Sequence, residues 1–135
     1  MTEASPGVRE RPLSPHLQVW RWHVTMLTSI LHRVTGVGLY GATLLAAAWV
    51  VTLAAGPEAY GLYMGLLGTI PGKAVLFLVT VALFYHLGNG VRHLVWDAGR
   101  GMDVKSANVS SAAVIAFGLV AAIAVWAVAG LMGAL

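Results

Sequence analysis

Three long stretches of the chain contain no Asp, Glu, Lys or Arg, and they restrict the fold more than any other feature. They cover residues 34–55, 74–91 and 106–135. As a helix, the first stretch is roughly 33 Å long, enough to cross a hydrocarbon core of about 30 Å. Charged residues make up 10% of the chain and its mean hydropathy is +0.80, whereas a soluble domain has roughly 25% charged residues. We therefore predict an all-α integral membrane protein with three transmembrane helices.

Residues that typically end helices lie between these stretches and set the expected helix boundaries. Gly56, Pro57 and Glu58 form a helix stop, and a short interfacial helix fits the loop that follows them. With 135 residues, we expect one domain that begins with a short segment ahead of the first span and contains no cleaved signal or transit peptide. The predicted parts are the segment 1–23 and transmembrane helices at 24–55, 73–97 and 109–132.

The basic residues predict the orientation of the chain. Seven of the eight lie before or early in the first span or around the loop after the second: Arg9, Arg11, Arg21, Arg33, Arg92, Arg100 and Lys105. Only Lys73 lies in the first loop. Because Lys and Arg are enriched in cytoplasmic loops, we predict a cytoplasmic amino terminus and a carboxyl terminus on the opposite side. These charges border apolar spans, so we expect a lipid bilayer as partner and no nucleic acid.

The chain has no cysteine. Disulfides, thiolate metal sites and cysteine-ligated iron–sulfur clusters are therefore excluded from it. It also lacks a glycine-rich dinucleotide fingerprint. A metal bound by this chain needs histidine or oxygen ligands.

A polar stripe interrupts the second span. At about 100° per residue, His86, Gly90, His93 and Asp97 fall on one helix face. Polar groups at membrane depth are costly unless they face protein, a cofactor or water, so the stripe is a candidate functional site. An imidazole beside the small residues Gly88 and Gly90 suggests haem. The alternative is a neutral histidine that hydrogen-bonds a neighbouring helix, and spacing alone favours that alternative.

Two motifs resemble one known family. The pattern His86-x-x-x-Gly90-x-Arg92-His93-x-x-x-Asp97 is similar to the second-helix motif of the cytochrome b subunit of succinate dehydrogenase. RPLSPHL at residues 11–17 and SILHRVTG at residues 29–36 resemble the amino-terminal signature of the same family, in the same order. The resemblance therefore covers residues 11–97.

The resemblance implies that His86 is an axial ligand of haem b and that a second membrane anchor subunit supplies the other ligand. His93 lies one heptad nearer the cytoplasmic interface, so it cannot bind the same iron from the same helix. The candidates for contacts with the haem propionates or with the ligand itself are His32, Arg33, Arg92 and His93. Arg92 lies roughly 120° from the His86 face, and snorkelling to lipid headgroups is an equally favoured role for it.

Ser29 and Arg33 are four residues apart and share one face at the start of the first span. A hydroxyl and a guanidinium suit a quinone carbonyl, on which reduction builds negative charge. From spacing alone we favour the alternative in which Arg33 is a positive-inside anchor and Ser29 bonds its own backbone. The resemblance instead implies that both residues line a ubiquinone site.

The resemblance implies a membrane anchor subunit of succinate:quinone oxidoreductase that does not oxidise succinate itself. Its partners would be the iron–sulfur subunit, which docks near His16, and the flavoprotein subunit. We expect the bacterial cytoplasmic membrane, with a periplasmic carboxyl terminus, in preference to the mitochondrial inner membrane. The alternatives are the anchor of a quinol:fumarate reductase and a haem-free scaffold or transporter subunit.

Overall fold

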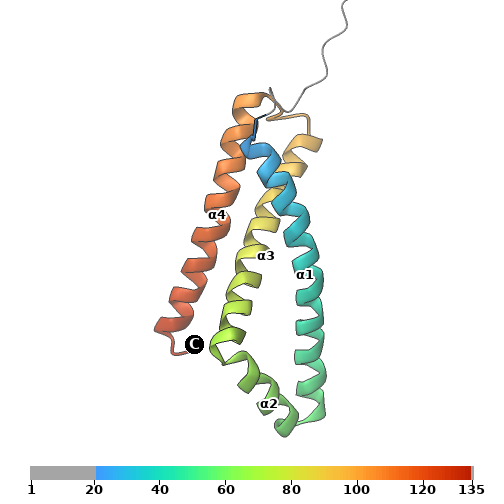
Figure 1. The fold of residues 1–135 in the computed structure, drawn as a ribbon, viewed down its shortest axis with the longest axis vertical. Helices are drawn as coiled ribbons and strands as arrows, with labels where there is room; N and C mark the ends of the chain where they lie inside the picture. Colours follow the sequence, from blue (N-terminus) through green and yellow to red (C-terminus); the bar gives the residue numbers. More distant parts are fainter. Residues whose placement is uncertain (1–20, 135) are drawn as a thin grey trace, which may run out of the picture.

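The computed structural model describes residues 21–134, which form four helices and no strand (Figure 1). The helices are α1 (Val24–Ala55), α2 (Pro57–Leu67), α3 (Ile70–Asp97) and α4 (Val104–Leu131). Three of them, α1, α3 and α4, are long and apolar enough to cross a membrane. The prediction of an all-α membrane bundle is confirmed.

The three long helices meet at one end of the bundle and spread apart toward the other (Figure 1). The start of α1, the end of α3 and the start of α4 lie together at the first end, which we call the polar end. The short helix α2 joins α1 to α3 at the opposite end. The most extensive packing in the bundle involves α3, first with α4 and then with α1, so α3 is the central element.

Local sequence signals explain where the helices begin. Pro57 is the first residue of α2, where its missing N–H costs nothing. The Thr69 hydroxyl caps α3 by accepting a hydrogen bond from the backbone N–H of Gly72. Asp103 caps α4 through the N–H of Ser106 at 2.9 Å, and hydrogen bonding to Ser106 lowers the pKa of that carboxyl.

Two of the helices extend beyond the spans predicted for them. The helix α3 begins at Ile70 rather than at residue 73, and α4 begins at Val104 rather than at residue 109. In both cases the residue that caps the helix lies several positions before the charge-free run. The membrane boundaries themselves stay predictions.

Close backbone approach holds α3 against α4. A Cβ atom added at Gly118 would lie 2.8 Å from Cβ of Tyr85, so only glycine fits there. Farther from the polar end, the rings of Phe77 and Trp126 pack edge to face with their centroids 5.4 Å apart. The Trp126 indole N–H donates to the Thr80 hydroxyl at 3.2 Å. Small residues at such a contact let membrane helices pack by van der Waals attraction.

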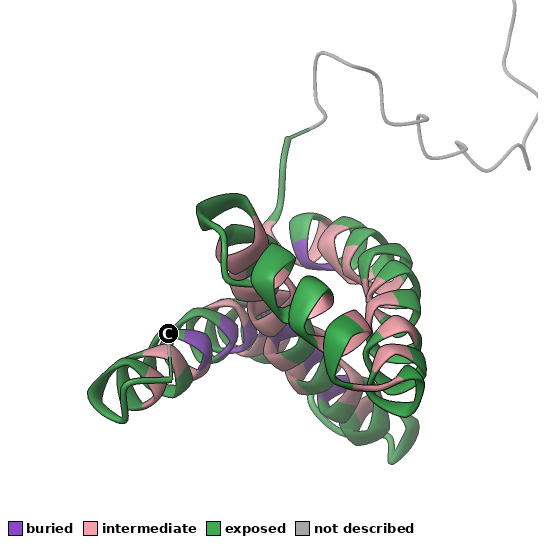
Figure 2. Cartoon of the chain, turned by 90° about the horizontal axis from the view of Figure 1, so that it is seen from below, coloured by how far each residue is buried: buried purple, intermediate pink, exposed green. Residues whose placement is uncertain are grey.

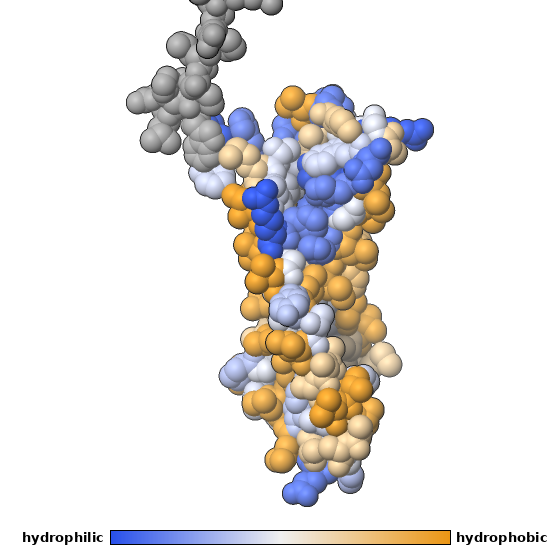
Figure 3. Space-filling view, turned by 90° about the vertical axis from the view of Figure 1, so that its right-hand side faces the viewer, coloured by the Kyte–Doolittle hydropathy of each residue, from blue (hydrophilic) through white to orange (hydrophobic). Residues whose placement is uncertain are grey.

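Most apolar side chains lie on the outside of the bundle. Figure 2 shows buried residues only where the helices meet, and Figure 3 shows hydrophobic surface over most of the length of the molecule. Large exposed residues occur on every long helix, for example Tyr40 on α1, Leu78 on α3 and Val120 on α4. Such a surface belongs in lipid or against other membrane helices.

Candidate functional site

His86 lies on the side of α3 that faces α1. Its ring is half-buried, and its Nδ1 lies 3.2 Å from the hydroxyl of Thr35 on α1. A Cβ atom at Gly36 would lie 3.3 Å from Cε1 of His86, which is tighter than an ordinary contact. The imidazole therefore lies against α1, where it meets the Thr35 hydroxyl and the backbone at Gly36. Nε2, on the other side of the ring, is the nitrogen left for a metal.

Two further imidazoles, those of His32 and His93, lie on the side of His86 that is toward the polar end. The ring of His32 lies 4.0 Å from that of His86 and 5.1 Å from that of His93, between centroids. We call these three residues the histidine row. Nε2 of His32 is buried and has no hydrogen-bond partner among residues 21–134. The structure thus brings together three of the residues singled out in the sequence.

His93 differs from His86 in exposure and in its partner. It is exposed, and its Nδ1 donates to the backbone carbonyl of Asn89 at 2.7 Å, because a carbonyl can only accept. The centroid of its ring also lies 5.1 Å from that of the Trp96 ring. His93 is therefore the exposed member of the row, whereas His86 lies about 10 Å farther along the helix from the polar end.

Ser29 and Arg33 are both exposed on α1. In the part of the chain that the structure describes, neither side chain has a hydrogen bond or an ion pair. They flank residues that face inward, since Thr28 is fully buried and His32 belongs to the histidine row. A hydroxyl and a guanidinium are thus available on the outer surface of α1, beside the row.

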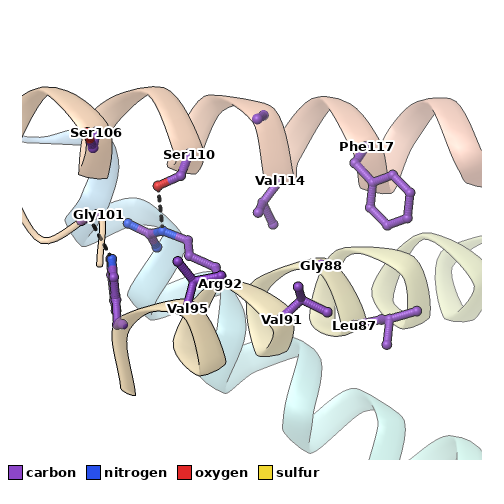
Figure 4. Close-up of a pocket in the computed structure, with 12 residues that line it drawn as sticks. Leu87, Gly88, Val91, Arg92, Val95, Gly101, Ser106, Ser110, Val114 and Phe117 are labelled. Atoms are coloured by element: carbon purple, nitrogen blue, oxygen red, sulfur yellow. Dashed lines mark hydrogen bonds between the residues drawn. The ribbon is translucent and has the colours of Figure 1, made fainter. Parts of the chain in front are cut away.

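Arg92 is buried, with 6% of its surface exposed, and its side chain extends toward Ser110 on α4 (Figure 4). Its guanidinium donates through Nε to the hydroxyl of Ser110 at 3.0 Å and through Nη2 to the Ala107 carbonyl at 3.1 Å. Through Nη1 it donates to Asn89 Oδ1 at 3.2 Å and to the Thr28 hydroxyl at 3.4 Å. All these partners are neutral.

These contacts correct the alternative in which Arg92 snorkels to lipid headgroups. The guanidinium is held by protein groups on three helices, and it also lies 4.0 Å from the ring of Trp96. Gly88 likewise faces α4 and not the imidazole, because a Cβ atom there would lie 3.0 Å from Phe117. The face of α3 that carries Arg92 packs against α4, and the face that carries His86 lies against α1.

Sequence reasoning missed the hydroxyls that join the helices. The Thr28 hydroxyl lies 3.3 Å from that of Ser111 on α4, and the Tyr85 hydroxyl donates to the Thr28 carbonyl at 2.7 Å. Thr28, Asn89 and Ser111 are all fully buried. Their signal in the sequence is only that they are polar residues within or at the edge of apolar spans, near Arg92.

A groove of about 520 Å³ lies between α3 and α4 beside Arg92 (Figure 4). Its walls are mainly apolar, from Leu87, Val91 and Val95 on α3 and from Val114 and Phe117 on α4. It contains no histidine and neither Ser29 nor Arg33. The groove is therefore separate from the histidine row.

Of the two amino-terminal signatures, the first lies outside the residues that the structure describes and the second lies in α1. The first is RPLSPHL at residues 11–17, with His16, so the structure does not place it relative to the histidine row. The second signature, residues 29–36, forms part of α1 and contributes His32, Thr35 and Gly36 to the site. The two quoted motifs of the helices therefore meet in space.

Comparison with known proteins gives one family. The profile described as "Succinate dehydrogenase/Fumarate reductase transmembrane subunit" matches residues 8–125. The succinate dehydrogenase cytochrome b556 subunit of Paracoccus denitrificans is 40% identical over 113 residues, which is 84% of this chain and 87% of that protein.

Two other relatives agree. The cytochrome b556 subunit of Rickettsia felis is 34% identical over 117 residues, 87% of this chain and 91% of that protein. The mitochondrial cytochrome b560 subunit of Mus musculus is 35% identical over 107 residues, 78% of this chain and 63% of that protein. The match to the profile covers every residue of the histidine row, as well as Ser29, Arg33 and Arg92.

Proposed function

The chain belongs to the family of transmembrane subunits of succinate dehydrogenase and fumarate reductase, and within that family we propose that it anchors a succinate:quinone oxidoreductase, holds haem b and contributes to ubiquinone reduction. The observation that carries the proposal is the setting of His86. Its imidazole lies inside a membrane-spanning helix, hydrogen-bonded through Nδ1 and backed by glycine. A neutral histidine with Nε2 free is the usual form of an axial haem ligand.

The donor set near His86 fits one axial ligand of haem. A histidine imidazole can hold haem iron, and Nε2 of His86 would be the atom that holds it, because Nδ1 is engaged by Thr35 of α1. When bound, haem b supplies one-electron transfer. The exposed cation Arg33 and the imidazoles of His32 and His93 would contact its propionates, since propionates are anionic and need donors. Arg92 was also a candidate for contact with the propionates, but its donors are engaged by protein groups on α1, α3 and α4. Its role would instead be to hold α3 in place.

Ser29 and Arg33 would bind ubiquinone on the outer face of α1. Both side chains are exposed and free of protein partners in residues 21–134. An Arg guanidinium stabilises negative charge that builds on the quinone oxygens, and the hydroxyl can donate to the same carbonyl. Thr28 and His32 hold this part of α1 against the bundle, which keeps the two donors in a fixed position.

Other subunits would complete the site. A second membrane anchor would supply the other axial histidine, and its helices would cover exposed apolar surface of this chain. The iron–sulfur subunit would bring electrons from the flavoprotein subunit, which oxidises succinate. This chain would then be the non-flavin part of the enzyme, with no catalytic role toward succinate alone.

The complex would lie in the bacterial cytoplasmic membrane, with the polar end of the bundle in the cytoplasm. The start of α1 and the loop that contains Arg100 lie at the same end of the bundle, whereas α2 lies at the other (Figure 1). Basic residues favour the cytoplasmic side. The histidine row approaches that side, where a soluble iron–sulfur subunit can dock.

The test is purification of the intact complex through a tag on this chain. We expect the flavoprotein, iron–sulfur and second anchor subunits to co-purify, with a low-spin b-type spectrum and succinate-dependent ubiquinone reduction. A membrane complex with no haem band would instead favour a haem-free scaffold. A complex that reduces fumarate with quinol faster than it oxidises succinate would favour a fumarate reductase anchor.

A further inference from the structure

The hydroxyl of Thr35 occupies a position in which its hydrogen-bonding roles can be worked out. It lies 2.8 Å from the carbonyl of Leu31, 3.1 Å from that of His32 and 3.2 Å from Nδ1 of His86. A hydroxyl has one proton and two acceptor lone pairs, and a carbonyl oxygen can only accept. The Thr35 proton therefore goes to the backbone of its own helix, as is common for threonine in membrane helices.

It follows that Thr35 accepts the proton of His86. With its own proton directed at a carbonyl, Oγ1 can meet Nδ1 only as an acceptor, so Nδ1 of His86 carries the hydrogen. A neutral imidazole protonated at Nδ1 has its lone pair at Nε2. The hydroxyl of Thr35 thus selects the tautomer in which Nε2 can bind a metal.

Gly36 fixes the position of the same ring. Because a Cβ atom there would lie 3.3 Å from Cε1 of His86, the ring lies directly on the backbone of α1. The hydrogen bond from Nδ1 then restricts rotation of the ring about its bond to Cβ. Adjacent residues of α1 therefore set both the tautomer and the orientation of a side chain on α3.

From these contacts we infer that Thr35 is a positioning residue for haem, which selects the His86 tautomer and raises the basicity of Nε2 through the Nδ1 hydrogen bond. This inference rests on the proposed role of His86 as axial ligand. Partners behind metal-binding histidines typically change metal affinity about 10- to 100-fold when they are removed. A more basic imidazole stabilises ferric over ferrous haem, so loss of the bond raises the midpoint potential.

The experiment compares Thr35→Val and Thr35→Ala with Thr35→Ser in the purified complex. Val keeps the shape of the threonine side chain but removes its hydroxyl, and Ala removes the hydroxyl and the methyl group. Ser keeps the hydroxyl and removes only the methyl group. We expect Val and Ala to lower haem occupancy and to raise the midpoint potential, by 59 mV for a tenfold change in the ferric-to-ferrous ratio. Ser should remain at the wild-type values.

The matched control is Thr52→Val. Thr52 lies on the same helix, and its hydroxyl donates to the carbonyl of Ala48 in the same i−4 arrangement, at 2.9 Å. It has no histidine partner among the described residues. Removing its hydroxyl should leave the haem potential and occupancy unchanged.

The outcomes separate Thr35 from His86. If Val and Ala behave like the Thr52 control while His86→Leu loses the low-spin signal, the inference for Thr35 is overturned and the role of His86 stands. If His86→Leu keeps an unchanged low-spin signal, the proposed ligand itself is wrong. If neither Val nor Ala gives an assembled complex but Ser does, the hydroxyl acts in folding, which also contradicts a role in tuning haem.

Discussion

The guanidinium Nε of Arg92 donates a 3.0 Å hydrogen bond to the hydroxyl of Ser110, and this contact links α3 to α4 inside the bundle. Through Nη1 the same side chain reaches Thr28 on α1 at 3.4 Å. One buried cation therefore joins all three long helices close to the histidine row. The arrangement explains how α1 and α3 can keep a fixed register where His32 lies against His86.

Replacing Arg92 with Met should destabilise the bundle by about 3 kcal/mol, because buried acceptors lose a charged donor. The measurement is the unfolding transition of the purified complex in detergent. Arg100→Met is the control, since Arg100 is exposed in the turn after α3 and its loss should change stability little. Equal stability of the two variants would mean that the Arg92 contacts contribute nothing net.

Gly118→Ala should separate α3 from α4. The added methyl group would lie 2.8 Å from Cβ of Tyr85 and 3.0 Å from its Cα, so backbone must move, at a cost of about 1–3 kcal/mol. The control is Gly61→Ala in α2, where nothing lies within 4 Å. Thermal unfolding that is unchanged in Gly118→Ala would refute the close packing at this point.

The long apolar helices and the shared face of His86 and His93 could be predicted from sequence because they depend on local pattern. Charge-free length predicts helices, and the spacing of His86 and His93 places them on one face whatever surrounds them. The role of Arg92 could not be predicted in this way. Which neighbour its face meets depends on how α4 packs, and α4 is apolar almost all round.

The hydroxyl partners illustrate the same limit. Thr28, Thr35 and Ser111 are compatible with ordinary backbone bonding inside their own helices, and each does make such a bond. Their second contacts span 51 residues for Thr35 with His86 and 83 residues for Thr28 with Ser111. Only the packed bundle brings those pairs together.

Arg33→Leu should reduce ubiquinone reduction about 100-fold, because developing negative charge loses its fixed donor. Succinate oxidation with an artificial acceptor should stay normal in the assembled complex. Arg33→Lys should recover part of the loss, since a point charge does not reproduce the planar guanidinium. Normal quinone turnover in Arg33→Leu would leave Arg33 only the role of a charge at the membrane surface.

The orientation can be tested with reporters whose activity depends on the compartment. An alkaline phosphatase fused after Leu135 should be active, because we expect the carboxyl terminus in the periplasm. The same reporter inserted near Gly101, in the turn between α3 and α4, should be inactive. The reverse pattern would put the histidine row near the periplasmic side and would contradict docking of the iron–sulfur subunit there.

The most direct test is electron paramagnetic resonance of haem in the purified complex, with His86→Leu and His93→Leu compared side by side. Haem content alone does not decide, because the ring of His32 lies 4.0 Å from that of His86 and offers another base. We predict that the wild-type low-spin signal is lost in His86→Leu and kept in His93→Leu, with at most a shifted potential. An unchanged low-spin signal in His86→Leu, together with its loss in His93→Leu, would assign the ligand to His93 instead.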